Sequence, residues 1–258
     1  MPALQQPEPE AAAPGLPADR PAQIGFQRFS TAEFLAALIL LFVATPFVET
    51  IPHGDSIEAV LMTLVLVSGV LAVGQSHRML VWAGVLMVPA VTGKWLNHFW
   101  PELVPKEVSL AVGLVFLIFL VGQFLRFILR APRVNSEVMY AGISVYLLLG
   151  LSWMFAYLIV DGLIPGSFAF STGPSAGQSM TGFNAYYFSF ITLTTVGYGD
   201  ITPVSNGARA LAAMEAMTGT LYVAVLISRL VALYSSQGSR FTRTTSPGEG
   251  PQTIDTEQ

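Results

Sequence analysis

Cysteine is absent from the 258 residues, and charged side chains make up only 11% of them. The missing cysteines exclude a disulfide framework. Soluble domains are about one quarter charged, so this chain lacks the charge needed to cover a water-facing surface on all sides. Hydrophobic residues make up 53% of the chain, and the mean hydropathy is +0.60. The composition therefore indicates an integral membrane protein.

The two ends of the chain carry neither a secretory signal nor enough apolar residues to fold alone. Residues 1–30 are polar and rich in proline and alanine, and the first apolar run begins near Phe34. Residues 236–258 are rich in glycine, serine, threonine and glutamine. We expect both segments to be disordered tails without a soluble ligand domain.

Six apolar segments approach the length of about 20 residues that crosses a bilayer. They are residues 32–48, 57–73, 79–93, 108–128, 138–160 and 208–234. The third is short and contains Pro89, which predicts a kink or a continuation through Trp95. The apolar segment 184–193 is too short to span and lies between the last two spans. Non-helical backbone at membrane depth needs protein or water around it, so a short helix and a glycine-rich strand here predict a pore.

The basic residues indicate how the spans are oriented, because positively charged loops remain in the cytoplasm. With the N-terminus inside, most basic residues fall at or near the cytoplasmic face: Arg20, Arg28, Arg78, Arg126, Arg130, Arg133, Arg229, Arg240 and Arg243. Only Lys94, Lys106 and Arg209 fall outside. This asymmetry predicts a multi-pass protein with both termini in the cytoplasm.

The segment Thr194–Asp200, with the sequence Thr-Thr-Val-Gly-Tyr-Gly-Asp, follows the short helix. An ion that leaves water must exchange its hydration shell for other oxygens, and backbone carbonyls can supply them. Successive carbonyls can face one path only if the backbone leaves the usual β region, which Gly197 and Gly199 permit. Thr195 adds a hydroxyl at the inner end.

The remaining side chains of this segment have predicted supporting positions. We expect Val196 and Tyr198 to turn outward and pack behind the strand, and Asp200 to accept a hydrogen bond at the outer mouth. The preceding helix points its C-terminal end at the membrane centre, and the partial negative charge there favours a cation.

This pattern closely resembles the pore loop of tetrameric potassium channels. The resemblance implies a homotetramer in which each chain supplies one strand of a selectivity filter. It implies passive conduction of K⁺ rather than enzymatic activity, with K⁺ bound by carbonyls of Thr195, Val196, Gly197 and Tyr198 and the filter completed by Gly199. It also implies a bacterial plasma membrane, with K⁺ and lipid as the partners, no nucleic acid and no cofactor.

The residues around the filter depart from the family pattern in two places. Tyr187 and Phe188 stand where these channels usually carry two tryptophans. Phe188 cannot donate a hydrogen bond, so we expect Tyr187 to bond Asp200 and, with Thr194, to support the filter. Ile191 stands where some members carry a glutamate behind the filter.

Three residues of the last span are candidates for gating. Gly219 matches an inner-helix glycine that acts as a hinge in related channels, although a small residue for close helix packing is an equally good interpretation. Arg229 matches a basic residue at the inner mouth of some relatives. Glu215 is a carboxyl group within a span, which needs a partner or water. We expect either a structural hydrogen bond to Ser189 or Thr192, or a functional role as a pH-sensitive gate or as a ring that concentrates cations.

The four spans before the pore copy the layout of voltage-gated channels without their charges. A voltage sensor needs charges in the membrane field, each worth about 2.3 kcal/mol per 100 mV. Residues 108–124 contain no basic side chain, and Arg126, Arg130 and Arg133 cluster at the cytoplasmic end. We therefore predict little voltage gating. The short link 131–137 suggests that the four helices pack on the pore helices of their own subunit.

These observations predict an all-α integral membrane fold with two parts. Residues 31–133 form a four-helix transmembrane unit, and residues 134–235 form a pore domain with two spans, a re-entrant pore helix and the filter. Two alternatives remain at this point: a subunit of a potassium uptake transporter, and a membrane sensor whose four-helix unit binds a ligand or lipid.

Overall fold

The computed structural model describes residues 31–48, 51–52, 54–73, 77–100, 102–133, 135–171 and 180–243. The helices within these ranges are α1 (Thr31–Val48), α2 (Gly54–Val73), α3 (His77–Phe99), α4 (Lys106–Arg130), α5 (Ser136–Leu163), α6 (Gly182–Leu193) and α7 (Asn206–Arg243). Two short strands, β1 (Phe168–Phe170) and β2 (Ile201–Pro203), complete the described elements.

All helices except α6 are long and apolar enough to cross a membrane. The predicted six-span, all-α membrane fold is therefore confirmed. Helix α6 has only 12 residues and lies between α5 and α7 in the chain, as expected for a re-entrant helix.

Several helices extend beyond the predicted segments, because polar residues at their ends still form helical turns. Helix α3 runs from His77 to Phe99, past the predicted end at residue 93. Helix α7 continues to Arg243, so the predicted disordered tail from residue 236 is wrong for residues 236–243. The expected tails at 1–30 and 244–258 lie outside the described residues.

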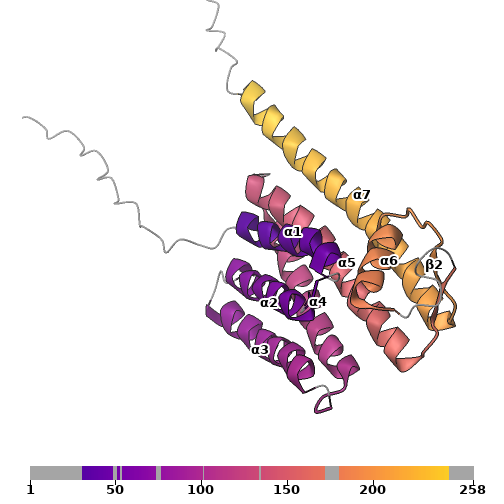
Figure 1. Ribbon diagram of the computed structural model, residues 1–258. Helices are drawn as coiled ribbons and strands as arrows, with labels where there is room; N and C mark the ends of the chain where they lie inside the picture. The colour runs from indigo at the N-terminus through magenta and orange to yellow at the C-terminus, as the bar shows by residue number, and fades with distance from the viewer. Residues whose placement is uncertain are drawn as a thin grey trace, which may run out of the picture.

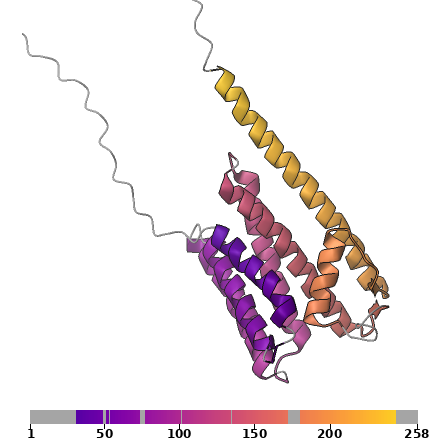
Figure 2. The same ribbon diagram turned by 45° about the horizontal axis from the view of Figure 1, so that its top comes forward.

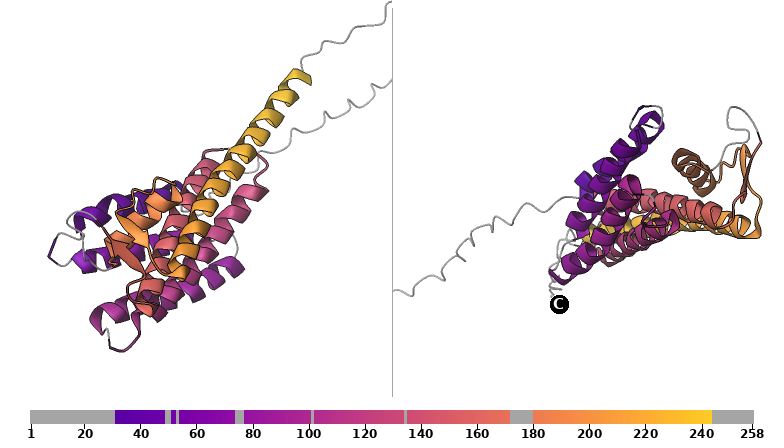
Figure 3. Two further views of the ribbon diagram at one scale, coloured as in Figure 1. Left: turned by 90° about the vertical axis from the view of Figure 1, so that its right-hand side faces the viewer. Right: turned by 60° about the horizontal axis from the view of Figure 1, so that its bottom comes forward.

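The helices form two adjoining groups (Figure 1). Helices α1 to α4 lie together on one side, and α4 packs along α5 as the most extensive helix contact. Helix α6 packs against both α5 and α7. Helix α7 runs alongside α5 and projects past the bundle (Figure 3). The core is a continuous apolar cluster that includes Phe34, Phe116, Leu148 and Tyr157.

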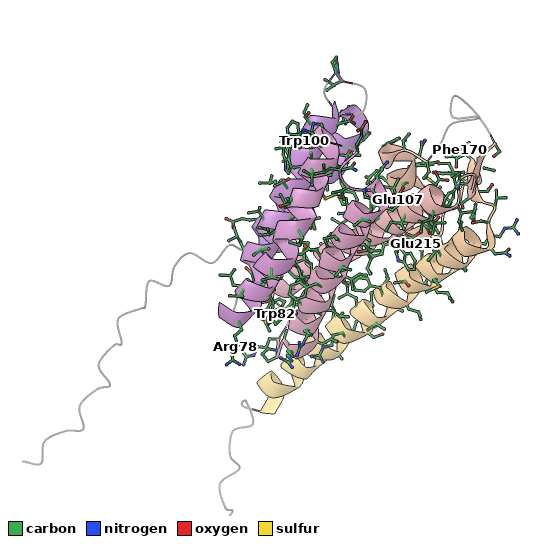
Figure 4. The ribbon with its side chains drawn as sticks, turned by 90° about the horizontal axis from the view of Figure 1, so that it is seen from below. Arg78, Trp82, Trp100, Glu107, Phe170 and Glu215 are labelled. Atoms are coloured by element: carbon green, nitrogen blue, oxygen red, sulfur yellow. The ribbon has the colours of Figure 1, made fainter. Side chains whose placement is uncertain are left out.

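The two ends of the bundle carry different features. Helix α7 ends on the side of the bundle where α1 begins, and the two-stranded sheet of β1 and β2 lies at the opposite end (Figure 2). Arg78 and Trp82 lie toward the first end, and Trp100 and Phe170 lie toward the second (Figure 4). Six spans, an even number, place the start of α1 and the end of α7 on the same side.

Local signals explain where the pore helices begin. The side chain of Asn135 accepts a hydrogen bond from the Val138 amide at the start of α5, and Thr181 caps α6 in the same way through Asn184. Such caps satisfy amide groups that have no partner within the helix. They fix the starting points of α5 and α6.

Candidate functional site

The backbone of residues 195–199 alternates in a way that ordinary strands do not. Thr195, Gly197 and Gly199 have φ angles of 60°, 52° and 81°, so every second residue adopts the left-handed region. Glycine adopts this region without strain. Thr195 is the only described non-glycine residue with a positive φ, a conformation that costs roughly 1–2 kcal/mol. Strain of this kind is concentrated at functional sites.

The inner half of this segment is hydrogen-bonded to carbonyls of the last turn of α6. The amides of Val196 and Gly197 both donate to the Ile191 carbonyl, at 2.8 and 3.1 Å. The Thr195 amide donates to the Thr192 carbonyl at 2.9 Å. The position of the segment is therefore set by the position of α6.

The outer half is hydrogen-bonded to Ser171, which directly follows β1 of the two-stranded β1–β2 sheet. The strands pair antiparallel, with Ala169 opposite Thr202. The Ser171 amide donates to the Asp200 carbonyl at 2.9 Å, and its hydroxyl oxygen lies 3.1 Å from the Gly199 carbonyl oxygen. Neither this two-stranded sheet nor the contact of Ser171 was expected from the sequence, because three-residue strands carry too little periodicity to be detected.

The two residues that stand at the positions of the family's tryptophans make different kinds of contact. The Tyr187 hydroxyl donates a side-chain hydrogen bond to Asp200. Phe188 is buried and packs edge-on against Tyr157 and Phe168, with ring centroids 4.9 and 5.4 Å apart. Tyr187 therefore contacts the outer end of the segment directly, whereas Phe188 packs the pore helix against α5 and β1.

Two side chains expected to pack behind the segment have no cover within one chain. Val196 is 52% exposed and Tyr198 is 73% exposed, so their packing stays a prediction for the assembled protein. Thr194 is also exposed, and its hydroxyl donates to the Phe190 carbonyl at 2.6 Å, closing the last turn of α6. The surfaces of Val196 and Tyr198 remain open to a neighbour.

Glu215 lies on α7 and is fully buried against α5 and α6 (Figure 4). Ser189 of α6 lies 2.6 Å from one carboxyl oxygen, and the Tyr157 hydroxyl of α5 bonds the other. The expected partner on the pore helix is therefore Ser189, and Thr192 makes no contact of this kind. Tyr157 was missed, although a tyrosine within a span needs a polar partner and could have been matched to Glu215.

Gly219 lies one turn beyond Glu215 and contacts the next turn of α6. A Cβ atom added at this position would lie 2.2 Å from the Leu193 carbonyl oxygen. Real Cβ atoms do not approach so closely, so a glycine is required for α7 to pack here. This favours the close-packing interpretation of Gly219, and it leaves the hinge role as a proposal.

Arg229 joins α7 to the last turn of α4. One of its terminal nitrogens donates to the carbonyls of Leu129 and Ala131, at 3.0 and 3.3 Å. These carbonyls lie at the negative end of the α4 dipole, which favours a cation. The four-helix unit and the last span of the same chain are therefore in direct contact.

A second contact joins the four-helix unit to the pore helix. The Phe42 ring of α1 packs against Phe190 and Tyr186 of α6, with centroids 4.6 and 5.3 Å apart. The Thr31 hydroxyl also donates to the Glu137 carboxylate of α5. These contacts fit the prediction that the unit packs on the pore helices of its own subunit.

A cavity of about 360 Å³ lies between α2, α3, α4 and α5, and Gly182 of α6 also lines it. Leu66, Leu117 and Phe155 are among the apolar residues of its wall, and charged residues that include Glu58 and Lys94 also line it. These two form an ion pair, at 3.1 Å. The described residues contain no cluster of three or more acidic, histidine or cysteine side chains that could hold a metal.

Comparison with known proteins places the similarity over the last two spans. Residues 157–236 match the profile of the family described as "Ion channel". Protein LctB of Bacillus caldotenax is 31% identical over 102 residues, covering 38% of this chain and 74% of that protein. Two pore potassium channel c of Oryza sativa subsp. japonica is 36% identical over 69 residues, which cover 27% of this chain and 14% of that protein.

A third relative is the inward rectifier potassium channel Kirbac3.1 of Paramagnetospirillum magnetotacticum. It is 31% identical over 107 residues, which cover 40% of this chain and 29% of that protein. The chain therefore spans most of protein LctB but less than a third of the two named potassium channels.

The fold and the site together define an all-α membrane channel, with a short helix and an extended segment between its last two spans. The chain belongs to the ion channel family and is a member of the potassium channel superfamily.

Proposed function

We propose that four copies of this chain form a potassium-selective channel in which residues Thr195–Gly199 line the path. The observation that carries the proposal is the alternation of left-handed residues at 195, 197 and 199 in a segment anchored at both ends. Such a backbone turns several carbonyls toward one side, where they can replace the water of a K⁺ ion. The names of two relatives as potassium channels support K⁺ as the ion.

The homotetramer is supported by the surfaces that one chain leaves open. A single extended segment cannot surround an ion, so several copies must meet around one axis. Val196 and Tyr198 beside the path are exposed, and so is most of α7, whose span is only 11% buried. We propose that neighbouring chains cover Val196 and Tyr198, which one chain leaves unpacked.

The proposed channel conducts passively and responds little to voltage. The central part of α4, residues 108–124, carries no basic side chain that could move in the membrane field. Conduction–voltage curves of the reconstituted channel are expected to be shallow. A steep curve that flattens after neutralisation of Arg126 and Arg130 would contradict this part of the proposal.

Location, orientation and gating complete the proposal. We place the channel in a bacterial plasma membrane with both termini in the cytoplasm, because arginines gather at the end where α7 terminates. Gly219 and Arg229 act in gating, since one packs α7 on the pore helix and the other holds α7 to α4.

A flux assay in liposomes tests the proposal. Gly197→Ser places a side chain at a φ of 52° and is expected to abolish K⁺-driven flux. Gly207→Ser is the matched control, because a Cβ at Gly207 meets nothing within 4 Å. Equal flux in Gly197→Ser and wild type would contradict the proposal. Gel filtration with mass measurement separates a tetramer from a single-chain transporter.

A further inference from the structure

Glu215 is the only acidic or basic side chain among the described residues that is buried, and its exposure is 0%. Among the described residues its side-chain partners are the hydroxyls of Tyr157 and Ser189, and none is a lysine, arginine or histidine. An ionised carboxylate without a cation is costly in an apolar interior, and the cost persists within a membrane. The surroundings therefore favour the neutral acid.

Counting hydrogens around Glu215 leads to the same result. Three short oxygen–oxygen contacts form a chain: Tyr157 to the carboxyl, the carboxyl to Ser189, and Ser189 to the Gly150 carbonyl at 2.8 Å. Each contact needs one hydrogen. The two hydroxyls supply only two, and a backbone carbonyl supplies none. The third hydrogen must come from the carboxyl group.

We propose that Glu215 is a neutral positioning residue that donates its proton to Ser189 and thereby fixes the pore helix to α5 and α7. Tyr157 donates to the second carboxyl oxygen, and Ser189 passes its own hydrogen to the Gly150 carbonyl. The arrangement joins three helices through one carboxylic acid. The effect of Glu215 on conduction rests on the proposed channel function, whereas the hydrogen bonds themselves do not depend on conduction.

The position of this contact explains how it would act on the conducting segment. Glu215 and Gly219 lie one turn apart on α7, and they meet Ser189 and Leu193, one turn apart on α6. In the segment that follows α6, the amides of Val196 and Gly197 donate to the Ile191 carbonyl. A movement of α6 away from α7 therefore moves the conducting segment.

Ionisation of Glu215 would remove the hydrogen that the chain requires and leave an uncompensated charge. The titratable groups that face Glu215 are both on α5, Tyr157 in direct contact and Tyr146 through electrostatic interaction. From α6 only the Ser189 hydroxyl faces it. Since no basic group is present to hold the anion, we expect conduction to fall as rising pH removes the proton.

Infrared spectroscopy of the full-length protein in liposomes tests the protonation state directly. Wild type is expected to show the carbonyl band of a protonated carboxylic acid, and Glu215→Gln is expected to lose it. Glu58→Gln is the matched control, because it removes a carboxyl group that contacts Lys94 and not Ser189 or Tyr157, so the band is expected to remain. Absence of the band from wild type at neutral pH would overturn the proposal.

Ser189→Ala keeps the acid but removes the acceptor of its proton, so the band should remain and move to higher wavenumber. An unmoved band would contradict donation to Ser189, even if Glu215→Gln fails to fold. Glu215→Gln itself can donate to Ser189 and accept from Tyr157, so we expect near wild-type flux that no longer falls with pH.

The two proposals fail separately in these measurements. A protonated acid band without K⁺ flux in wild type would contradict the channel function and leave the role of Glu215 intact. Flux without the band would do the reverse. Flux in Glu215→Gln that falls with pH as steeply as in wild type would refute the coupling between this proton and conduction.

Discussion

The two halves of this molecule are held together by different forces. Helices α1 to α4 pack mainly through apolar side chains, and the polar contacts between them are few, such as the Lys94–Glu58 pair. The pore half, α5 to α7, adds buried polar contacts between helices, among them Glu215 with Ser189 and Tyr157. Only the pore half matches the family profile.

This difference indicates where geometry matters most. Apolar packing tolerates substitution when volume is conserved, whereas a buried hydrogen bond fixes two groups to a few tenths of an ångström. The filter segment needs such fixed positions, because its carbonyls must meet an ion at defined distances. We therefore expect substitutions in the pore half to change conduction, and comparable ones in the four-helix unit to leave it unchanged.

Among substitutions outside residues 195–199, the largest effect is expected from Gly219→Ala. The added Cβ would meet the Leu193 carbonyl at 2.2 Å, so α7 must move away from the pore helix at a cost of about 1–3 kcal/mol. Single-channel recording should show a changed open probability with unchanged selectivity. Gly207→Ala is the control, since its Cβ meets nothing within 4 Å. An unaltered open probability in Gly219→Ala would contradict the tight packing.

Tyr187→Phe is expected to have the next effect. The substitution removes the hydroxyl that bonds Asp200, and loss of one partner of such a bond costs about 1–3 kcal/mol. Shorter open bursts and a lower thermal stability of the assembled protein should result. Tyr186→Phe provides the comparison, because Tyr186 makes ring contacts but no side-chain hydrogen bond in the structure. Similar burst lengths in both variants would argue against the role of Tyr187.

Arg229→Gln tests the connection between the two halves. It removes a cation from the negative end of α4, worth about 0.3–1 kcal/mol, and weakens the bonds to Leu129 and Ala131. The open probability should shift while the reversal potential stays constant. Arg126→Gln alters the same end of α4 without touching α7. If both variants shift gating equally, net charge rather than the contact is responsible.

The smallest effect is expected from Glu58→Gln in the four-helix unit. Partly exposed ion pairs contribute about 0–1 kcal/mol, so loss of the pair with Lys94 should lower the melting temperature only slightly. Conduction and its dependence on voltage should match those of wild type. A large loss of flux would show that the four-helix unit controls the pore through this pair, against the comparison drawn above.

Most of the architecture could be predicted from hydropathy and charge alone. The six spans, the short helix between the last two and the contact of Glu215 with Ser189 all follow from the need to satisfy polar groups in lipid. The ends of helices were less predictable. The third segment was predicted to end at residue 93 or to continue through Trp95, yet α3 runs to Phe99, and Lys94 and Asn97 within it bond Glu58 and the Val104 carbonyl.

Contacts between distant segments were beyond sequence reasoning. Strand β1 and Ser171 lie before α6 in the chain, and nothing in their sequence indicates that they hold Asp200. The need for a glycine at position 150 was likewise not predictable, because it arises from the Phe190 ring, which would lie 2.0 Å from a Cβ at this position. The packing of Val196 and Tyr198 stays a prediction, because it needs surfaces that the chain itself does not provide.

The most direct test of a potassium-selective pore is the reversal potential of the purified protein in a bilayer with K⁺ on one side and Na⁺ on the other. A reversal close to the K⁺ equilibrium potential, abolished with the current by Gly197→Ser and retained in Gly207→Ser, is the predicted result. Current that reverses near zero in wild type would show that residues 195–199 do not select K⁺ and would contradict the account.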